Sequence, residues 1–369
     1  MQSPLHSRIA VHTFHLLKMM DWFFVPAGVI ILLPILIDCC TYYHSFLLIG
    51  FVACIRYIFI PADCDFLLWF IERFGYPVER INGHVVWITG ASSGIGRALA
   101  IRLAKAGVKV AISARSLENL NQVKQACIET GGVEAQDVMV LPLDMVQFDQ
   151  HQAAFDAVIK HFGKLDILVN NAGRSQRGNW EMIELDVDRQ LFDLNVFSVI
   201  SLSRLVMKYF IEKGRGHFVV TSSVAGKAGA PLSASYTGSK HALHGYFECL
   251  RVEKAGLGLD ITVACPGVVD SNLLRVCFTE RKGKQLGLER KGKKMSAERC
   301  ADLMAIAIAN RMSEVWIANQ PALLLMYMNQ YLPVITKNVF HIIPLKFLMK
   351  LRDGRVDTIQ ETNVKKQKS

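Results

Sequence analysis

The stretch that most constrains the fold starts at Val85, where a strand-like segment, a glycine-rich turn and a helix-like segment follow one another without a break. Val85 to Thr89 is apolar, and RALAIRLAKAG follows the turn. Glycines let the backbone approach a pyrophosphate, and a helix N-terminus offers unpaired N–H groups to an anion. This order indicates a dinucleotide site, although a tight connection without a ligand is the alternative and the spacing is not GxGxxG. The candidate binding residues are Gly90, Ser92, Ser93, Gly94, Ile95 and Gly96.

Short strand-like segments alternate with amphipathic helical segments over most of the remaining chain. Such alternation predicts an α/β fold, a doubly wound (Rossmann) parallel sheet with helices on both faces. Ile95 to Ala106 and Leu117 to Thr130 are two of the expected helices. The expected strands are Val85 to Thr89, Val108 to Ser113, Val138 to Leu143, Ile167 to Asn170, His217 to Thr221, Ile261 to Ala264 and Val315 to Ile317.

Composition excludes several classes of protein. With 51% hydrophobic and 20% charged residues, the 369-residue chain is too apolar for intrinsic disorder. Its nine cysteines include no CxxC pair, which excludes a zinc ribbon, an iron–sulfur site and a small disulfide scaffold, so no metal is expected. A membrane transporter is excluded because too little of the chain is apolar for a bundle of spans.

The N-terminal region has the composition of a membrane anchor. From Trp22 to Ile60 the only formal charges are Asp38 and Arg56. A helix over Trp22 to Ile37 would be about 24 Å long, shorter than a hydrocarbon core of about 30 Å, so it needs its neighbours to span. One span and a helical hairpin both fit; a single span would place the catalytic domain in the lumen and a hairpin would return it to the cytosol. Buried helices of a soluble domain and a cleaved signal peptide are the alternatives.

The pattern divides the chain into four parts. Residues 1–62 are the expected anchor, 63–81 a linker, and 82–320 the catalytic domain. Residues 321–369 form an apolar segment interrupted by lysines and prolines, followed by a basic tail. We interpret the apolar segment as lying on the membrane or beside the substrate, with a helix packed on the core as the alternative.

The end of the second strand indicates which nicotinamide cofactor is used. NAD-preferring folds place an acidic residue there, whereas this chain has Arg115, with Ser113 close by. An arginine can form charge-assisted hydrogen bonds to a 2′-phosphate, which predicts NADP(H); a solvated arginine is the alternative. Asp144 ends the third strand and is expected either to meet the adenine amino group or to cap a helix.

Tyr236 and Lys240 are four residues apart, so on a helix they share a face. A neighbouring ammonium favours the phenolate, which a general acid/base must be able to form. Taken alone, this spacing is more often a surface pair. Here it follows Asn170-Asn171-Ala172-Gly173 and Ser222-Ser223, and that order makes the pattern specific.

The motifs TGASSGIG, NNAG, SSVAG and YTGSK occur in the order typical of the short-chain dehydrogenase/reductase family, which the chain resembles from about Asn82 to Asn319. The anchor, SARSLENL and EVWIANQPALLLMYMNQYLP make it similar to membrane-anchored members. The resemblance implies NADP(H)-linked carbonyl/alcohol chemistry on lipophilic substrates such as steroids or retinoids.

The resemblance also assigns roles to residues. It implies that Tyr236 is the acid/base, that Lys240 binds the nicotinamide ribose and tunes Tyr236, and that Ser223 orients the substrate oxygen, with Ser222 as the less favoured neighbour. Asn195 would hold a water in the proton relay. The residues expected beside the cofactor are Asn171, Ala172, Gly173, Pro266, Gly267, Val269 through its backbone, and Ser271, where the family usually has threonine.

We therefore expect a membrane-anchored oxidoreductase in the endoplasmic reticulum. The alternative is a non-catalytic NADP(H)-binding scaffold or sensor, which would usually have lost one of the motif residues. The expected partners are a small lipophilic substrate and membrane lipid, with no nucleic acid; a homodimer stays open. The segment from Arg281 to Lys294 holds seven basic residues and one acid and is expected either to be a lid near anionic headgroups or to be a solvated loop.

Overall fold

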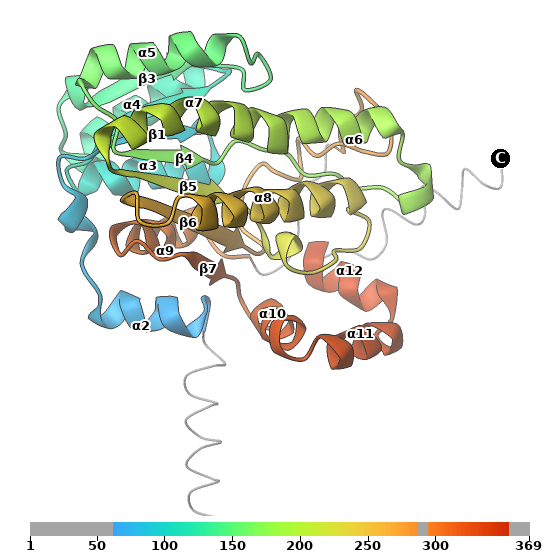
Figure 1. Ribbon diagram of the computed structural model, residues 1–369. Helices are drawn as coiled ribbons and strands as arrows, with labels where there is room; N and C mark the ends of the chain where they lie inside the picture. The colour runs from blue at the N-terminus through green and yellow to red at the C-terminus, as the bar shows by residue number, and fades with distance from the viewer. Residues whose placement is uncertain (1–61, 287–293, 354–369) are drawn as a thin grey trace, which may run out of the picture. The chain divides into compact units, whose positions relative to one another are not determined.

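Seven parallel strands form one sheet in the computed structural model, which describes residues 62–286 and 294–353. The strands are ordered β3-β2-β1-β4-β5-β6-β7, and all six neighbouring pairs are parallel (Figure 1). Every residue of β1, β4 and β5 is buried, and most of their residues are apolar, as expected for parallel strands that are covered on both faces. The strands are β1 (Val85–Thr89), β2 (Lys109–Ala114), β3 (Val138–Pro142), β4 (Ile167–Asn170), β5 (Gly216–Thr221), β6 (Leu259–Pro266) and β7 (Glu314–Ile317).

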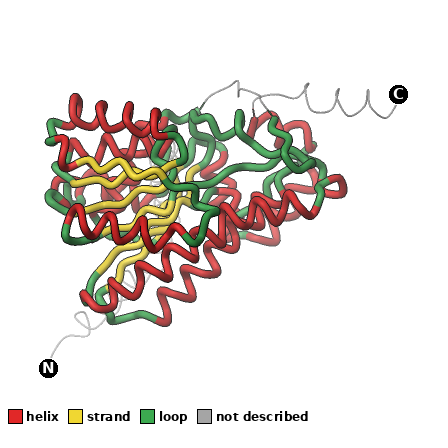
Figure 2. The backbone as a smooth tube through the Cα atoms, turned by 90° about the horizontal axis from the view of Figure 1, so that it is seen from above, coloured by secondary structure: helices red, strands yellow, loops and turns green. Residues whose placement is uncertain are grey.

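Alternate residues of β1 enter two separate hydrophobic cores, because successive side chains of a strand point to opposite faces. Val86 and Ile88 lie in the core with α3 (Gly94–Lys105), α4 (Leu117–Gly131) and α9 (Ala297–Ala309). Val85 and Trp87 lie in the core with α5 (Gln150–Phe162), α7 (Ser198–Lys213) and α8 (Ala234–Glu253). Figure 2 shows the strands side by side with helices on both sides. The predicted doubly wound sheet is confirmed.

The position of β1 determines where a ligand can bind. It pairs with β2 on one side and with β4 on the other, so the order of winding reverses at this point. The loops that follow β1 and β4 therefore diverge at the carboxyl edge of the sheet. Ligands of open parallel sheets bind at such a switch point.

α6 (Leu185–Phe192), the π-helical turn η4 (Asp193–Phe197) and α7 follow one another without a break and form one long helical stretch. Its α7 part lies on the same face of the sheet as α5 and α8. Within the described residues, Leu185–Lys213 is the one helix long and apolar enough to cross a membrane. Its most apolar window is 56% buried inside the molecule, and α7 packs on β4 and β5. We interpret it as a core helix of the domain.

The segment 63–81, which the sequence predicts to be a linker, is folded onto the domain. It forms α2 (Phe66–Phe74) and the 3-10 turn η1 (Val78–Ile81), and Leu68 of α2 is fully buried. The Arg299 guanidinium of α9 pairs with Asp63 at 2.7 Å and also with Glu72. The compact unit accordingly begins at Ala62. The expected anchor, apart from its last residue, lies outside the described residues.

Three helices follow β7: α10 (Ala322–Tyr331), α11 (Pro333–Ile342) and α12 (Leu345–Asp353). α10 packs on the domain through Leu323 and Met326. Other side chains of these helices face the cavity described below. The basic tail beyond residue 353 and residues 287–293 of the basic segment lie outside the described residues. The remaining 3-10 turns are η2 (Ala135–Asp137), η3 (Trp180–Met182) and η5 (Val224–Gly226).

Candidate active site

A cavity of about 1160 Å³ opens at the carboxyl edge of the sheet. It is lined by the loops after β1, β2, β3, β4, β5 and β6 and by side chains of α8, α10, α11 and α12. Of the residues predicted from the sequence, all except Gly96, Ser113 and Asn195 belong to its described wall. Gly96 and Asn195 lie behind the wall and support it, as their contacts show.

The glycine turn after β1 has the shape of a cradle for a large anion. Gly94 has φ +55° and faces the loop after β6, since a Cβ on it would lie 3.0 Å from that of Ser271. A Cβ on Gly96 would collide with the carbonyl oxygen of Gly90, so glycine is needed for α3 to start this close to β1. Among the described residues Ser93 forms no side-chain cap on α3. The N–H groups of the first turn can therefore serve a ligand, and these residues fit a dinucleotide pyrophosphate.

Arg115 lies directly after β2 and is an exposed part of the cavity wall. The prediction that Ser113 assists it is wrong, because Ser113 is buried and its hydroxyl accepts a hydrogen bond from the Trp87 indole at 2.7 Å. Ser113 does not belong to the described wall of the cavity, whereas Arg115 does. Ser116, which caps α4, and Asn119 line the cavity beside Arg115 instead.

Asp144 lines the cavity after β3, and its carboxylate accepts the Val146 N–H at 3.3 Å. The alternative that Asp144 caps a helix is wrong, because α5 begins at Gln150 and its N-cap is Asp149. A second arginine, Arg174, lies near both Asp144 and Arg115. Burial lowers the pKa of Arg174, the Arg115 charge lowers it further and Asp144 raises it.

The loop after β4 is held by side chains at the ends of two other strands. The Thr89 hydroxyl of β1 accepts the N–H groups of Asn171 and Ala172 at 3.1 and 3.2 Å. The Asn171 amide donates to the carbonyls of Thr89 and Gly90 and accepts from the Thr221 hydroxyl of β5. Asn171 thereby joins β1 to β5 across the switch point, and its side chain braces the cavity wall.

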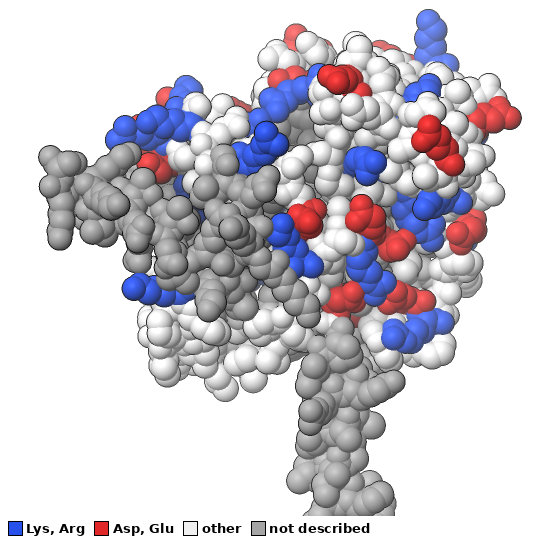
Figure 3. All heavy atoms as spheres, turned by 180° about the vertical axis from the view of Figure 1, so that it is seen from behind, with Lys and Arg blue, Asp and Glu red and all other residues white. Residues whose placement is uncertain are grey.

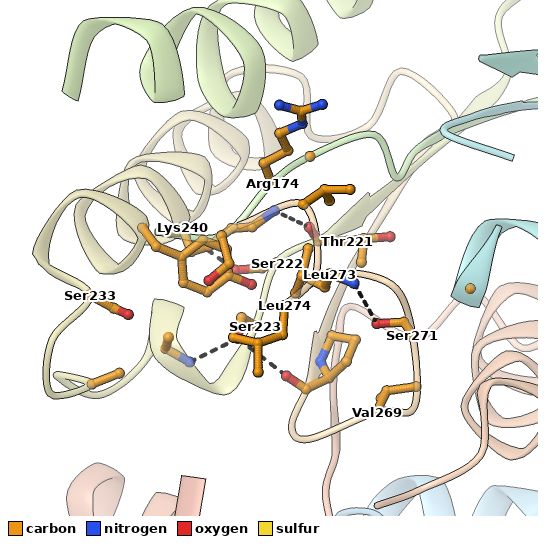
Figure 4. A pocket seen from close by; sticks show the side chains of 18 of the residues that line it. Arg174, Thr221, Ser222, Ser223, Ser233, Lys240, Val269, Ser271, Leu273 and Leu274 are labelled. Carbon is orange, nitrogen blue, oxygen red and sulfur yellow. Dashed lines mark hydrogen bonds between the residues drawn. The ribbon is translucent and has the colours of Figure 1, made fainter. Parts of the chain in front are cut away.

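Lys240 projects from α8 to the end of β5. Its ammonium donates to the Thr221 carbonyl at 2.8 Å and lies 5.8 Å from the centre of the Tyr236 ring (Figure 4). Burial lowers the pKa of Lys240 to about 8, because the charged form loses solvation. Tyr236, only 8% exposed, lines the cavity one helical turn before Lys240. The spacing of four residues on α8 therefore places both side chains next to each other in the cavity wall, as expected from the sequence.

The two serines after β5 point to different partners. Ser223 Oγ donates to the Pro266 carbonyl at 3.3 Å and accepts the Ala225 N–H at 3.1 Å, at the start of η5 (Figure 4). Ser222 Oγ is 3.3 Å from the Lys240 carbonyl and 3.0 Å from Nε2 of His244, one helical turn after Lys240 on α8. Both serines border the cavity, but the Ser222 hydroxyl is already engaged by these two groups of α8. The geometry favours Ser223 for contact with a substrate.

Asn195 lies in the π-helical turn η4 and is fully buried. Its amide oxygen accepts the Arg174 N–H at 2.9 Å, and its amide nitrogen donates to the Arg174 carbonyl and to Ser239 Oγ. π-Helical turns inside α-helices are frequent at functional sites. Here the turn directs Asn195 toward the loop after β4. By bonding to both Arg174 of that loop and Ser239, Asn195 connects the loop to α8. A role in holding a water stays a prediction.

The loop after β6 is fixed by a short bridge to the residues that follow the basic segment. Met295 donates its N–H to the Val268 carbonyl and accepts the Asp270 N–H. In a parallel bridge of this kind the peptide groups of Val269 point to the opposite side, where Val269 borders the cavity. Ser271 Oγ accepts the Leu273 N–H at 3.4 Å (Figure 4). This placement suits the predicted contact with a nicotinamide carboxamide.

Several residues that support the site were not predicted from the sequence. Thr89 and Thr221 are the last residues of β1 and β5, the two strands that flank β4, and that position is the signal that could have identified them. Ser239 lies inside the YTGSK motif, and Arg174 directly follows NNAG. Taken together, the cavity offers an anion cradle, a buried amine beside a phenol, and a hydroxyl, which can bind a nicotinamide dinucleotide and transfer a proton to or from a substrate oxygen. In the described residues no group of His, Cys, Asp and Glu could hold a metal.

Comparison with known proteins identifies the family. The family model described as short chain dehydrogenase matches residues 84–282. The human protein called dehydrogenase/reductase SDR family member 7 is 41% identical over 278 residues, which cover 74% of this chain and 82% of that protein. The Dictyostelium discoideum dehydrogenase/reductase SDR family protein 7-like is 38% identical over 52% of this chain and 61% of its own length.

Two similar solved structures contain nicotinamide cofactors. An actinorhodin polyketide ketoreductase with NADPH is 26% identical with a TM-score of 0.56, covering 64% of this chain and 96% of its own. A short-chain dehydrogenase/reductase from Burkholderia phymatum in complex with NAD is 26% identical with a TM-score of 0.59, covering 69% and 96%. The fold is therefore used with both kinds of nicotinamide cofactor.

Proposed function

This chain belongs to the short-chain dehydrogenase family of oxidoreductases, and from that membership we propose a membrane-anchored enzyme that uses NADP(H) to interconvert a carbonyl and an alcohol on a lipophilic substrate. The observation that carries the proposal is the meeting of Tyr236, Lys240 and Ser223 in one cavity with the glycine cradle of α3.

The preference for NADP(H) rests on the end of β2. NAD-preferring folds have an acidic residue at this position, whose carboxylate binds the ribose hydroxyls, whereas this chain has Arg115. The Arg115 guanidinium can instead form charge-assisted hydrogen bonds to the 2′-phosphate of NADP(H). The nearby charge of Arg174 adds to the positive potential at this end of the cavity. Ser116 and Asn119 can supply further hydrogen bonds.

Bound NADPH would supply the hydride that adds to a carbonyl carbon. Tyr236 then donates its phenolic proton to the substrate oxygen, and in the reverse direction it accepts that proton. Ser223 donates a hydrogen bond to the same oxygen by exchanging its long 3.3 Å bond to Pro266. Lys240 keeps its hydrogen bond to the Thr221 carbonyl, and this bond fixes the position of the ammonium. Its other N–H donors can then bind the cofactor ribose, and its charge lies near Tyr236.

The substrate is proposed to be lipophilic because of the far side of the cavity. Leu325 and Met326 of α10, Phe340 of α11 and Leu348 of α12 line it there. Phe278, from the loop after β6, covers the cavity from another side and is buried. A steroid, retinoid or other lipid-like molecule matches such walls. An anchor in the endoplasmic reticulum membrane, supported by the uncharged run before Ile60, would bring the enzyme to such substrates.

The test is single-turnover oxidation of bound NADPH in the wild type and in Tyr236→Phe, with steroids, retinals and lipid aldehydes as substrates. The rate should fall by roughly 10²- to 10⁴-fold while NADPH affinity is unchanged, because only the proton donor is removed. Tyr246→Phe, an exposed position on the same helix, is the matched control and should retain the wild-type rate. Equal rates in wild type and Tyr236→Phe would contradict Tyr236 as the proton donor, and no oxidation in either protein with any of these substrates would favour a non-catalytic NADP(H)-binding scaffold.

A further inference from the structure

α2 presents an apolar face to the outside of the molecule. Phe66, Phe70 and Phe74 follow one another at helical spacing and are 52%, 43% and 69% exposed, and Leu67 beside them is also exposed. Leu68 carries the contact of α2 with the core. A soluble helix normally exposes its polar face, so the outer face of α2 has the composition of a contact surface.

α11 and α12 repeat this pattern. Of the side chains described in α11, only Thr336 is buried, whereas Val334 and Ile342 are 70% and 81% exposed. Leu345 and Phe347 of α12 are half exposed. In Figure 3 the lower left of the molecule, where these helices lie in this view from behind, is mostly free of charged side chains.

The two apolar regions adjoin each other. The Phe66 N–H at the start of α2 donates to the Tyr327 hydroxyl of α10 at 2.8 Å, and the Tyr327 ring packs on Trp316 of β7. Figure 1 places α2, α10 and α11 along the same lower edge of the molecule. We call their exposed apolar side chains the apolar face: Phe66, Leu67, Phe70 and Phe74 of α2, with Leu324, Tyr331, Leu332, Val334, Ile335, Ile342, Leu345 and Phe347.

Chain length limits how far this face can lie from a membrane. The uncharged run of the proposed anchor ends at Ile60, and Asp63 is already fixed to the domain by Arg299. Three residues span at most about 10 Å. If the run before Ile60 enters a bilayer, as the proposed function holds, the start of α2 lies within about that distance of the headgroups.

We propose that the apolar face docks into the leaflet at which the anchor emerges, so that α2, α11 and α12 lie in the membrane interface. This inference rests on the anchored enzyme proposed above and adds a second contact with lipid. The charges agree with it, since the sequence from Ala322 to Arg352 contains no acidic residue and includes Lys337 and Lys346. Lysines beside apolar residues are typical of helices that lie on anionic membranes.

Docking would also give the substrate a route. Phe340 and Leu348 line the cavity, while Ile342 and Phe347, two residues or fewer away from them, belong to the apolar face. α11 and α12 therefore separate the cavity from the proposed lipid contact by the thickness of one helix. A lipophilic molecule could pass from the leaflet to the site of Tyr236 without crossing water.

The experiment uses the full chain in vesicles of phosphatidylcholine and phosphatidylserine that contain a phospholipid with a diazirine on its acyl chain. After irradiation, the labelled peptides are identified by mass spectrometry. We expect lipid adducts in α2, α11 and α12 in addition to residues 22–60. Adducts confined to residues 22–60 would overturn the proposal.

A triple variant tests the face directly. Val334→Glu with Ile342→Glu and Phe347→Glu should reduce the adducts in α11 and α12 at least about tenfold, because each carboxylate resists transfer into lipid. Adducts in residues 22–60 and NADPH binding should be unchanged. The matched control, Ile211→Glu with Val252→Glu and Leu257→Glu, changes exposed apolar positions away from the face and should leave the whole adduct map as in wild type.

The result is independent of catalysis, because the wild-type adduct map does not need a substrate or turnover. An inactive Tyr236→Phe enzyme that still forms lipid adducts in α2, α11 and α12 would support docking of the apolar face. The proposed enzymatic activity is decided separately by the single-turnover test. If these helices are unlabelled by lipid, and a bifunctional protein cross-linker added in a parallel sample joins them between two protein chains, a second copy covers the face and the proposal is wrong.

Discussion

At the scale of single residues, Lys240 makes cofactor binding depend on pH. Burial lowers its pKa from 10.5 to about 8, so its ammonium is present below that pH and is lost above it. If this charge contacts the cofactor, NADPH affinity should be constant up to about pH 7 and then decrease by up to tenfold per pH unit above about pH 8. Fluorescence titration of NADPH measures this.

Lys240→Met is the control for that titration. It should bind NADPH more weakly at neutral pH and show no decrease in affinity between about pH 7 and pH 9.5 beyond that of the free ligand. A decrease of the same slope in the variant would assign the titration to another group.

Arg115 should determine the choice between NADPH and NADH. A charge-assisted bond of about 1.5 to 3 kcal/mol corresponds to roughly ten- to 150-fold in affinity, so Arg115→Asp should shift the ratio of NADPH to NADH affinity by at least that factor. Arg189→Asp, an exposed arginine of α6 outside the cavity wall, should leave the ratio unchanged. Wild-type protein that binds both cofactors equally would contradict the role of Arg115.

At the scale of elements, the loop that carries Ser223 is tied to the C-terminal part of the domain. Lys227, four residues after Ser223, pairs with Glu314 of β7 at 3.1 Å, and its carbonyl accepts the Asn329 amide of α10 at 2.8 Å. Burial alone would raise the pKa of Glu314, but hydrogen bonds from His244 and Trp316 and the Lys227 charge lower it to about 2. Glu314 is therefore ionised at neutral pH and holds Lys227 in place.

Asn329→Leu should loosen this loop without touching the cofactor cradle. Loss of one hydrogen bond of about 1 kcal/mol predicts about a fivefold decrease in the single-turnover rate, with NADPH affinity unchanged. Gln330→Leu, at the adjacent exposed position, is the matched control and should behave as wild type. An equal loss of NADPH affinity in Asn329→Leu would show a general effect on the fold instead.

At the scale of the whole molecule, acid should destabilise the domain through the buried His217. Thr262 donates its single proton to the Met312 carbonyl, so His217 Nε2 must donate to Thr262. Burial, with added repulsion from Arg311, lowers the pKa of His217 to about 3. The unfolded chain takes up a proton below about pH 6.5, which the folded chain cannot.

The free energy of unfolding should therefore decrease by about 1.4 kcal/mol per pH unit between about pH 6 and pH 4 from this residue alone. Chemical denaturation at several pH values measures it. His217→Gln keeps a donor toward Thr262 but cannot titrate. Between about pH 6 and pH 4, the free energy of unfolding of this variant should therefore decrease less steeply with falling pH than that of the wild type, by the contribution of one proton. The same slope in both proteins would rule out His217 as the source.

Removal of residues 1–60 tests the anchor. The shortened protein should be released from carbonate-washed membranes, because a docked face is a peripheral contact whereas a span is not. It should still bind NADPH, since the cradle and the described core begin after Ala62. If the shortened protein stays in the membrane fraction after the carbonate wash, the membrane anchor would have to be assigned to the segment after Pro321.

The sequence by itself determined the sheet, the glycine turn and the shared face of Tyr236 and Lys240. Each depends on local patterns, namely runs of apolar residues, glycine positions and helical spacing, and the observed strands begin and end within two residues of those expected. The order of the strands in the sheet came from the structure.

Only the tertiary structure decided which polar groups meet. Ser223 was separated from Ser222 by contacts with Pro266 and His244, and Ser113 was assigned to Trp87 instead of the cofactor side. The supposed linker became part of the domain through Arg299, more than 200 residues away along the chain. Such pairings depend on the register of strands and the packing of helices between distant segments, and no local pattern of residues encodes them.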